Sequence, residues 1–268
     1  MIYYLIFLFS VFLFLLYIYC NTLCKKPVAK YNKIKYTEER KENFTPSKNW
    51  INSFFDVVYI ITIPKRLKNA EAFSKNLNIE PIIIDAVLKD SLERRKLLDE
   101  QKITYDNSLY YGRIACHLSH MKTLAYFLKS DYKTCLIFED DIIIEKDAEY
   151  YHAKIDSIMK SMPTDWDIIN FGPCWDVCRN MVKINDDISK SYEPHCRHAY
   201  SVTRKGAEII LQYAIPMKNM NGDKIIGELI KNNKLICYST TPPLFVQNRV
   251  KFKSELGNID TLKFCIDK

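Results

Sequence analysis

The sequence predicts an α/β fold with a mostly parallel sheet flanked by helices, preceded by an N-terminal transmembrane helix. From Asp56 onward, short apolar runs alternate with amphipathic stretches, a rhythm typical of parallel β-α-β units. Residues 2–19 form an uncharged apolar run, which is long enough to span a bilayer as a helix. The chain of 268 residues is 48% hydrophobic and 26% charged, as expected for one globular domain with appendages.

The predicted organisation has three parts. They are a transmembrane signal-anchor at residues 1–20, a basic stem or linker at 21–50, and a globular domain at 51–268. A cleaved signal peptide is the alternative for the first part, but the bulky Ile18, Tyr19 and Cys20 lack the small side chains that signal peptidase needs. We therefore expect a single-pass protein that contacts the membrane through residues 2–20.

The positive charge of the chain is concentrated next to the predicted anchor. Of the 39 Lys and Arg residues, eight lie in residues 21–50, together with only three of the 32 Asp and Glu residues. The remaining 31 basic and 29 acidic residues nearly balance, which argues against a basic groove for nucleic acid. We expect the stem to meet anionic lipid headgroups and the protein to have no nucleic-acid partner.

Two features give opposite indications about membrane topology. The lysines after the anchor favour a cytosolic domain under the positive-inside rule. In contrast, Cys174, Cys178 and Cys196 lie close together in a polar stretch, as disulfide partners in a secretory compartment do. Free thiols and a zinc site are the alternatives for these cysteines.

The elements follow from apolar periodicity. We expect strands at 57–63, 81–84, 133–138, 167–171, 198–202 and 234–238, and helices at 65–77, 91–101, 112–129, 147–162, 204–214 and 223–232. In the helix at 112–129, Ile114, Leu118 and Met121 are part of a buried stripe at helical spacing. The last 25 residues are polar and weakly patterned.

Three consecutive carboxylates follow the strand at 133–138. Glu139, Asp140 and Asp141 stand between two apolar runs, at the end of a strand where α/β proteins collect ligands. Such a triplet can hold a hard divalent cation, which would stabilise charge on a leaving phosphate. In this interpretation Asp141 is the direct metal ligand, and Glu139 faces the metal shell or a ribose. A solvated acidic turn is the alternative.

A literal Asp-x-Asp motif at Asp165-Trp166-Asp167 serves as a comparison. It precedes its expected strand at 167–171, and so it lies toward the wrong end of the sheet for a ligand site. We interpret Asp165 as a residue of a turn or helix end.

Three blocks resemble glycosyltransferase family 25. They are Gly112–His120 (GRIACHLSH), Leu136–Asp141 (LIFEDD) and His198–Ala207 (HAYSVTRKGA), in the family's order and separation. The opening strand, Val57–Ile63, is also similar to that of the family, although the usual Asn-Leu pair is replaced by Thr-Ile. The resemblance covers roughly residues 56–247. The family includes lipopolysaccharide β-galactosyltransferases and procollagen galactosyltransferases.

The resemblance implies a GT-A-like fold, which is related to the Rossmann fold, and an inverting hexosyltransferase. The expected sugar donor is UDP-galactose or UDP-glucose, the cofactor Mn²⁺ or Mg²⁺, and the acceptor a glycan, glycolipid or glycoprotein. Inversion requires a base for the acceptor hydroxyl. The candidate catalytic residues are Asp223 and Glu193, with His198 on the acceptor side. Because a signal-anchor and stem are the usual build of secretory-pathway transferases, we place the domain in the ER or Golgi lumen, with the cytosol as the alternative.

The candidate residues for binding the sugar donor lie at the ends of strands and on one helix. Arg113, His117 and His120 form a polar stripe at i, i+4 and i+7, suited to a diphosphate and to sugar hydroxyls, although structural hydrogen bonding is an equal alternative. The full set is Ile61, Thr62, Arg66, Asp85, Arg113, His117, His120, Glu139 and Asp140. The rival functions are another metal-dependent nucleotide-processing enzyme and a catalytically inactive, membrane-tethered module that binds nucleotide sugars or glycans.

Overall fold

The computed structural model describes residues 50–90, 111–214, 221–249 and 251–252. The chain divides into two compact units, Met1–Asn43 and Phe44–Lys268, and all described residues belong to the second. The expected anchor, almost all of the stem and the expected helix at 91–101 lie outside the described residues. Among the helices that are described, none has the length and apolar character needed to cross a membrane.

The centre of the domain is an eight-stranded sheet with the order β2-β1-β3-β8-β5-β9-β7-β6. The strands are β1 (Val57–Thr62), β2 (Ile82–Asp85), β3 (Thr134–Glu139), β5 (Ile168–Asn170), β6 (Val182–Lys183), β7 (Ile188–Lys190), β8 (Ala199–Thr203) and β9 (Cys237–Thr240). The pairs β1–β2, β1–β3 and β5–β9 are parallel. The α/β prediction is confirmed, but the sheet is mixed, because β8 runs antiparallel between β3 and β5 and β7 runs antiparallel beside β9.

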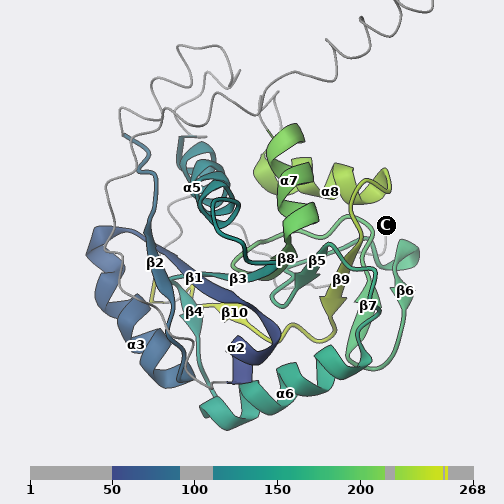
Figure 1. Cartoon of the computed structure of the whole chain (residues 1–268), viewed down its shortest axis with the longest axis horizontal. Helices are drawn as coiled ribbons and strands as arrows, with labels where there is room; N and C mark the ends of the chain where they lie inside the picture. Colours follow the sequence, from purple (N-terminus) through teal and green to yellow (C-terminus); the bar gives the residue numbers. More distant parts are fainter. Residues whose placement is uncertain (1–49, 91–110, 215–220, 250, 253–268) are drawn as a thin grey trace, which may run out of the picture. The chain divides into compact units, whose positions relative to one another are not determined.

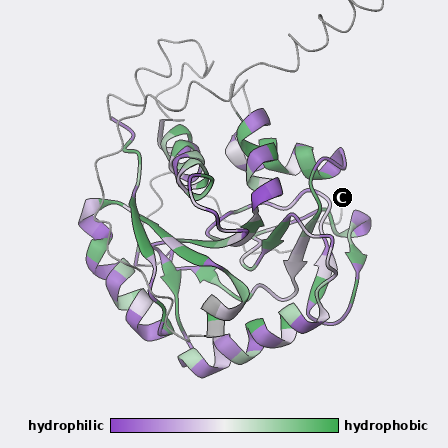
Figure 2. Ribbon diagram, viewed as in Figure 1, coloured by the Kyte–Doolittle hydropathy of each residue, from purple (hydrophilic) through white to green (hydrophobic). Residues whose placement is uncertain are grey.

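Helices cover both faces of this sheet (Figure 1). They are α2 (Trp50–Phe54), α3 (Leu67–Leu77), α5 (Tyr111–Phe127), α6 (Ala148–Ser161), α7 (Arg204–Tyr213) and α8 (Gly222–Lys231), with short 3-10 turns η2 (Pro64–Arg66) and η4 (Cys178–Asn180). Figure 2 shows that the central strands are predominantly hydrophobic, whereas the helices carry polar residues on their outer sides. This pattern is that of a sheet buried on both faces.

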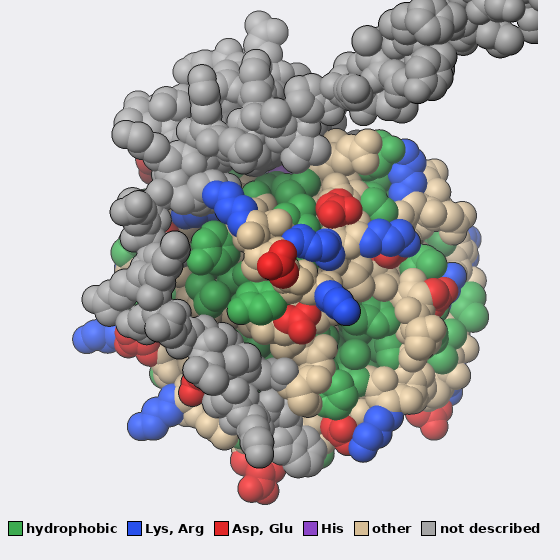
Figure 3. All heavy atoms as spheres, viewed as in Figure 1, with side chains coloured by type: hydrophobic (Ala, Val, Ile, Leu, Met, Phe, Trp, Pro, Cys, Tyr) green, Lys and Arg blue, Asp and Glu red, His purple; other side chains and the backbone are tan. Residues whose placement is uncertain are grey.

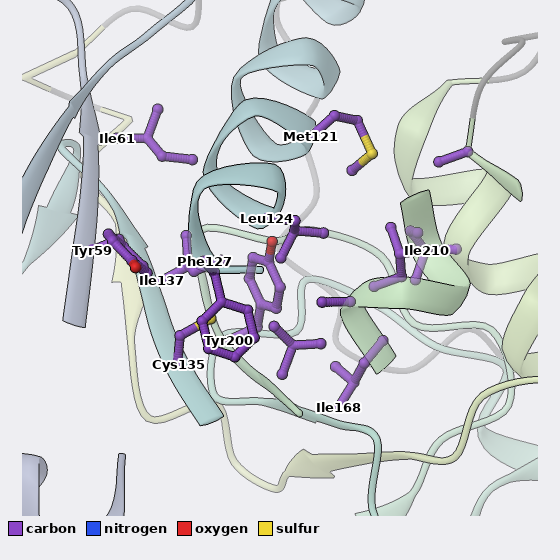
Figure 4. Close-up of a cluster of buried hydrophobic side chains, with 14 of the residues drawn as sticks. Tyr59, Ile61, Met121, Leu124, Phe127, Cys135, Ile137, Ile168, Tyr200 and Ile210 are labelled. Atoms are coloured by element: carbon purple, nitrogen blue, oxygen red, sulfur yellow. The ribbon is translucent and has the colours of Figure 1, made fainter. Parts of the chain in front are cut away.

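Alternate residues of each central strand enter two separate cores. Tyr59 and Ile137 pack with α5, α7 and α8 (Figure 4), while Ile60 and Phe138 pack with α2, α3 and α6. The period-2 alternation of side chains explains this division. It also explains why β1 is apolar up to its last residue, Thr62, since all six of its residues are buried.

Side-chain caps fix several helix starts close to their predicted positions. Asp147 accepts a hydrogen bond from the Tyr150 amide, and Thr203 accepts one from the Gly206 amide. Asn221 caps α8 in the same way. Each cap satisfies an amide that has no partner inside its helix, which is why the ends of α6 and α7 agree with the sequence pattern.

A segment near the C-terminus, residues 244–249, forms a strap that sequence patterning missed. Within it, β10 (Val246–Gln247) pairs antiparallel with β4 (Ile142–Ile143), directly after the acidic triplet. The ring of Phe245 is fully buried, with its centroid 5.1 Å from the ring centroids of both Phe138 and Tyr151. One buried aromatic residue and a two-residue strand are too short a pattern to be recognised from periodicity.

Replacement of Phe245 by Ala tests the contribution of the strap to the fold. We expect Phe245→Ala to lower the free energy of unfolding by on the order of 3–5 kcal/mol, because it leaves a cavity between two aromatic rings. The neighbouring Val246→Ala is the matched control. Because Val246 is 44% exposed, this change should lower the free energy of unfolding much less. Urea denaturation of the full-length chain in detergent measures both. Equal small effects would contradict the packing of the strap.

Candidate functional site

A cleft opens at the edge of the sheet where β1, β2 and β3 end. Because these three strands are parallel neighbours, their carboxyl ends share one edge, the usual place for ligands in α/β proteins. The cleft has a volume of about 460 Å³, which is within the range of small-molecule sites. Its lining consists of residues 61–66, 86–90 and 139–141 together with Gly112, Ala115, Cys116, Ser119, His120 and Gln247.

The middle carboxylate of the triplet, Asp140, points into the protein. Its Oδ2 accepts hydrogen bonds from the Thr62 hydroxyl at 2.7 Å and the Ile63 amide at 3.2 Å. Its Oδ1 accepts one from the Arg66 guanidinium at 3.2 Å. Asp140 thus joins the end of β3 to the turn after β1. Thr62 and Arg66 are expected ligands of the sugar donor, and both already serve this internal network.

The first carboxylate, Glu139, lies between α5 and the strap. Its Oε1 accepts a hydrogen bond from His120 Nε2 at 3.0 Å and lies 3.6 Å from the Cys116 sulfur. Its Oε2 accepts one from the Gln247 amide at 3.1 Å. Burial, together with the charges of Asp223 and Asp140, raises the pKa of Glu139 above its usual value, although the neighbouring His198 opposes this rise.

The third carboxylate, Asp141, shares the Gln247 side chain with Glu139. Gln247 Nε2 lies 3.1 and 3.2 Å from the two Asp141 oxygens, and its Oε1 accepts a hydrogen bond from Arg249. Burial and the Glu139 charge raise the pKa of Asp141 to about 7. One neutral amide therefore bridges the two carboxylates that were predicted to hold a metal ion.

His120 is fixed as a neutral ring. Burial and the nearby Arg197 hold its pKa well below the usual value. With its Nε2 proton directed at Glu139, the Nδ1 atom accepts from the Tyr200 hydroxyl at 3.2 Å. His120 is thus in the cleft, as predicted, with both nitrogens occupied.

His117, one helical turn before His120, faces away from the cleft. Its Nε2 is 3.1 Å from the Ala214 carbonyl and its Nδ1 is 3.3 Å from Arg197. Burial, followed by the Arg197 charge, lowers its pKa to about 3. The contacts of His117 are those of a structural histidine between α5 and α7.

Asp223 forms an ion pair close behind the site. Its Oδ1 accepts from Arg197 Nε at 2.8 Å, and its Oδ2 accepts from the Cys196 amide at 3.2 Å. Burial alone would raise the pKa of Asp223, but the Arg197 guanidinium holds it below the usual value. Such a carboxylate is a weak proton acceptor.

All but one of the remaining candidates also lie outside the lining of the cleft. His198 is buried and bonds to the Phe245 carbonyl at 3.0 Å, so it anchors the strap. Glu193 packs against Gly227 of α8. Asp85 is exposed at the end of β2, and Arg113 is half-buried near the start of α5. In contrast, Ile61 lines the cleft as expected.

The cysteine cluster contains a disulfide between Cys174 and Cys196, and Cys178 is disulfide-bonded as well. The disulfide interpretation is therefore confirmed, and these sulfurs are not available to zinc. At the Asp-x-Asp comparison motif, Asp165 accepts from the Tyr238 hydroxyl at 2.8 Å. Asp167 is buried, where it pairs with Lys205 and accepts from the Ile236 amide, so this motif is structural.

Sequence reasoning missed two residues of the site, Gln247 and Cys116. Gln247 carried no signal, because its position depends on the pairing of β10 with β4. Cys116 stands four residues before His120 on α5, a spacing that places two side chains on one helix face.

On the face of the protein seen in Figure 3, acidic and basic side chains are interspersed among apolar ones.

The raised pKa of Asp141 predicts a pH-dependent difference between the protein and its Asp141→Asn variant. A carboxyl that gains a proton on folding contributes stability below its usual pKa of 3.8, and this contribution is lost as pH rises to about 7. We therefore expect the free energy of unfolding of Asp141→Asn to rise relative to that of the unchanged protein as the pH increases across this range. The total change should be a few kcal/mol at most, since one pKa unit corresponds to about 1.4 kcal/mol. Denaturant titrations of both proteins, in the presence of a chelator and at several pH values, measure this difference. A pH-independent difference would contradict the assignment.

Comparisons with known proteins give one informative match. Among curated proteins, none is significantly similar in sequence. A solved structure, "Crystal Structure of A197 from STIV", aligns over 76% of this chain and 97% of its own with 11% identity and a TM-score of 0.36, a likeness too weak to support an argument. A family model described as "Glycosyltransferase family 25 (LPS biosynthesis protein)" matches residues 54–226, which include the acidic triplet and the carboxyl ends of β1, β2 and β3. The chain therefore belongs to glycosyltransferase family 25.

Proposed function

We propose that this glycosyltransferase transfers a hexose, galactose or glucose, from a UDP-sugar to a hydroxyl of a glycan, glycolipid or glycoprotein, with inversion. A divalent ion, Mn²⁺ or Mg²⁺, is held by Glu139 and Asp141. The observation that carries the proposal is the convergence of these two carboxylates on the single Gln247 amide, in a cleft at the ends of parallel strands.

The chemistry of the acidic pair supports a cation. Both carboxylates are largely buried, and burial is the main cause of their raised pKa values. The Glu139 charge raises the pKa of Asp141 further, and the charges of Asp223 and Asp140 do the same for Glu139. Carboxylate oxygens are the ligands that Mn²⁺ and Mg²⁺ prefer, and a divalent charge removes the repulsion between them. When bound, the ion supplies charge stabilisation for the leaving diphosphate.

The walls of the cleft suit a nucleoside diphosphate. Apolar side chains from the segment after β2, including Val87 and Leu88, line one part, and the cationic Lys65, Arg66 and Lys89 line another. Apolar walls with a few polar groups are typical of nucleotide sites, and cations match the diphosphate charge. The three parallel strands β2, β1 and β3, followed by the antiparallel β8, support the proposal of a GT-A-like arrangement.

Asp223 is our proposed base for the acceptor hydroxyl, ahead of Glu193 and His198. Its carboxylate is 32% exposed and close enough to affect the pKa of Glu139, whereas His198 is buried against the strap. The pairing with Arg197 opposes proton uptake, so this role requires the Arg197 contact to loosen when the acceptor binds.

We also propose that residues 2–20 anchor the protein as a single-pass membrane protein, with the catalytic domain in the ER or Golgi lumen. The Cys174–Cys196 disulfide supports an oxidising compartment. The basic stem favours the opposite, cytosolic orientation.

Metal-dependent release of UDP tests the proposed function. We expect the full-length chain in detergent to release UDP from one preferred UDP-sugar with an acceptor and Mn²⁺. Asp141→Asn should reduce the rate by roughly a hundredfold or more, as loss of one electrostatic stabiliser does in other enzymes. Asp186→Asn is the matched control and should retain the full rate, because Asp186 is exposed and does not line the cleft.

Other outcomes would identify the rival functions. Release of phosphate or UDP that does not increase with any acceptor would indicate a different nucleotide-processing enzyme. Binding of UDP-sugar without turnover would indicate an inactive binding module. Full activity of Asp141→Asn would contradict the metal assignment.

A further inference from the structure

We propose that Cys116, His120 and Glu139 form a second cation site that binds a borderline transition metal ion such as Zn²⁺ and competes with the hard divalent cation for Glu139. The sulfur, nitrogen and oxygen atoms of these residues lie within 4.8 Å of one another. This site differs from the Glu139–Asp141 pair in its chemistry, because it offers a thiol and an imidazole.

Two of the three separations between the ligand atoms are close to the edges of a tetrahedron around zinc. With ligand bonds of about 2.0 Å to nitrogen and oxygen and about 2.3 Å to sulfur, tetrahedral geometry places N and O about 3.3 Å apart and S and O about 3.5 Å apart. In the structure, His120 Nε2 and Cys116 Sγ lie 3.0 and 3.6 Å from the same oxygen, Glu139 Oε1. Shifts of a few tenths of an ångström would bring these two separations to the tetrahedral values, and the third, between nitrogen and sulfur, is within 4.8 Å.

The scaffold around these atoms is pre-organised for a metal. Cys116 and His120 are one helical turn apart on α5, so they project from the same face. Metal binding at Nε2 requires the ring proton of His120 to move to Nδ1, where it can be donated to the Tyr200 hydroxyl 3.2 Å away. A hydrogen bond of this kind orients a metal-binding histidine. Tyr200 is itself 2% exposed and packs in the core, so the imidazole has little freedom to turn away.

The site is open on one side. All three residues line the cleft, so the fourth coordination position is available to water or to a ligand, as in catalytic rather than structural zinc sites. Among the described free cysteines, Cys116 is the partly exposed one, whereas Cys135 and Cys237 are buried in strands of the sheet. Binding exchanges the thiol proton for the metal ion and releases that proton to solvent.

Sharing of Glu139 links the two sites. Its Oε1 faces Cys116 and His120, while its Oε2 faces Gln247 beside Asp141. A borderline metal bound to thiolate and imidazole would remove Glu139 from the hard-cation site. We therefore expect Zn²⁺ to displace Mn²⁺ from the protein through Glu139, even though Zn²⁺ does not bind Asp141.

Co²⁺ is the probe for this site, because a thiolate bound to Co²⁺ gives a charge-transfer absorption in the near ultraviolet. Full-length protein in detergent should develop this band when titrated with Co²⁺, and Zn²⁺ should abolish it. Cys116→Ser should lose the band, and Cys116→Ala serves as a second variant if the first fails to fold by circular dichroism. Asp141→Asn is the matched control, which should keep the band while binding Mn²⁺ at least tenfold more weakly.

A second measurement follows the competition directly. Free Mn²⁺, detected by electron paramagnetic resonance, should rise when Zn²⁺ is added to the Mn²⁺-loaded protein, and should rise much less with Cys116→Ser. Absence of a thiolate band in the unchanged protein, or an equal band in folded Cys116→Ser, would overturn the proposal. The second site itself does not depend on the proposed transferase activity, whereas its competition with Mn²⁺ rests on the proposed Glu139–Asp141 site. A Cys116-dependent band in a protein without UDP turnover would support the second site and contradict only the proposed function.

Discussion

Repulsion among three consecutive carboxylates at the end of β3 is the constraint on which the arrangement of the cleft depends. Two unit charges 4–6 Å apart at an effective dielectric constant of 20 repel by about 3–4 kcal/mol, which exceeds the net value of about 1 kcal/mol for a typical hydrogen bond. In the protein, the three carboxylates point in different directions. Asp140 turns inward to Arg66 and the end of β1, while Glu139 and Asp141 stay in the cleft and share a neutral amide. Burial, together with neighbouring carboxylates, raises the pKa values of both groups, which is the basis for proposing a cation as their partner.

Segments far apart in the chain supply the contacts to these carboxylates, and the sheet sets their positions. The β1–β3 register places Ile61 beside Glu139, so the turn after β1 reaches Asp140. The pairing of β10 with β4 places Gln247 opposite Ile142, next to Asp141 in the chain. The burial of Phe245 in the core holds this strap in place. The composition of the site therefore depends on packing on the α2–α3–α6 side of the sheet as well as on the strands.

Sequence reasoning reached the strands and the triplet because their signals are local. The apolar run before Glu139 and the helix caps are readable over a few residues, and three short blocks sufficed to identify the family. Local patterns carry no information on contacts that form only in the tertiary structure. His117 and His120 belong to one polar stripe, yet His117 meets Ala214 and Arg197 while His120 meets Glu139. Asp223 looked like a free carboxylate at a helix start, but Arg197, 26 residues earlier, pairs with it. The antiparallel direction of β8 likewise could not be predicted, because hydrophobic periodicity does not indicate the relative direction of strands.

The central claim is that the acidic pair binds a divalent ion together with the sugar nucleotide. Calorimetric titration of UDP into the full-length chain in detergent, with Mn²⁺ and with chelator in parallel, tests it most directly. We expect saturable UDP binding that requires Mn²⁺, because an ion held by Glu139 and Asp141 would stabilise the charge of the diphosphate. UDP binding of equal strength in chelator, or no binding under either condition, would contradict it.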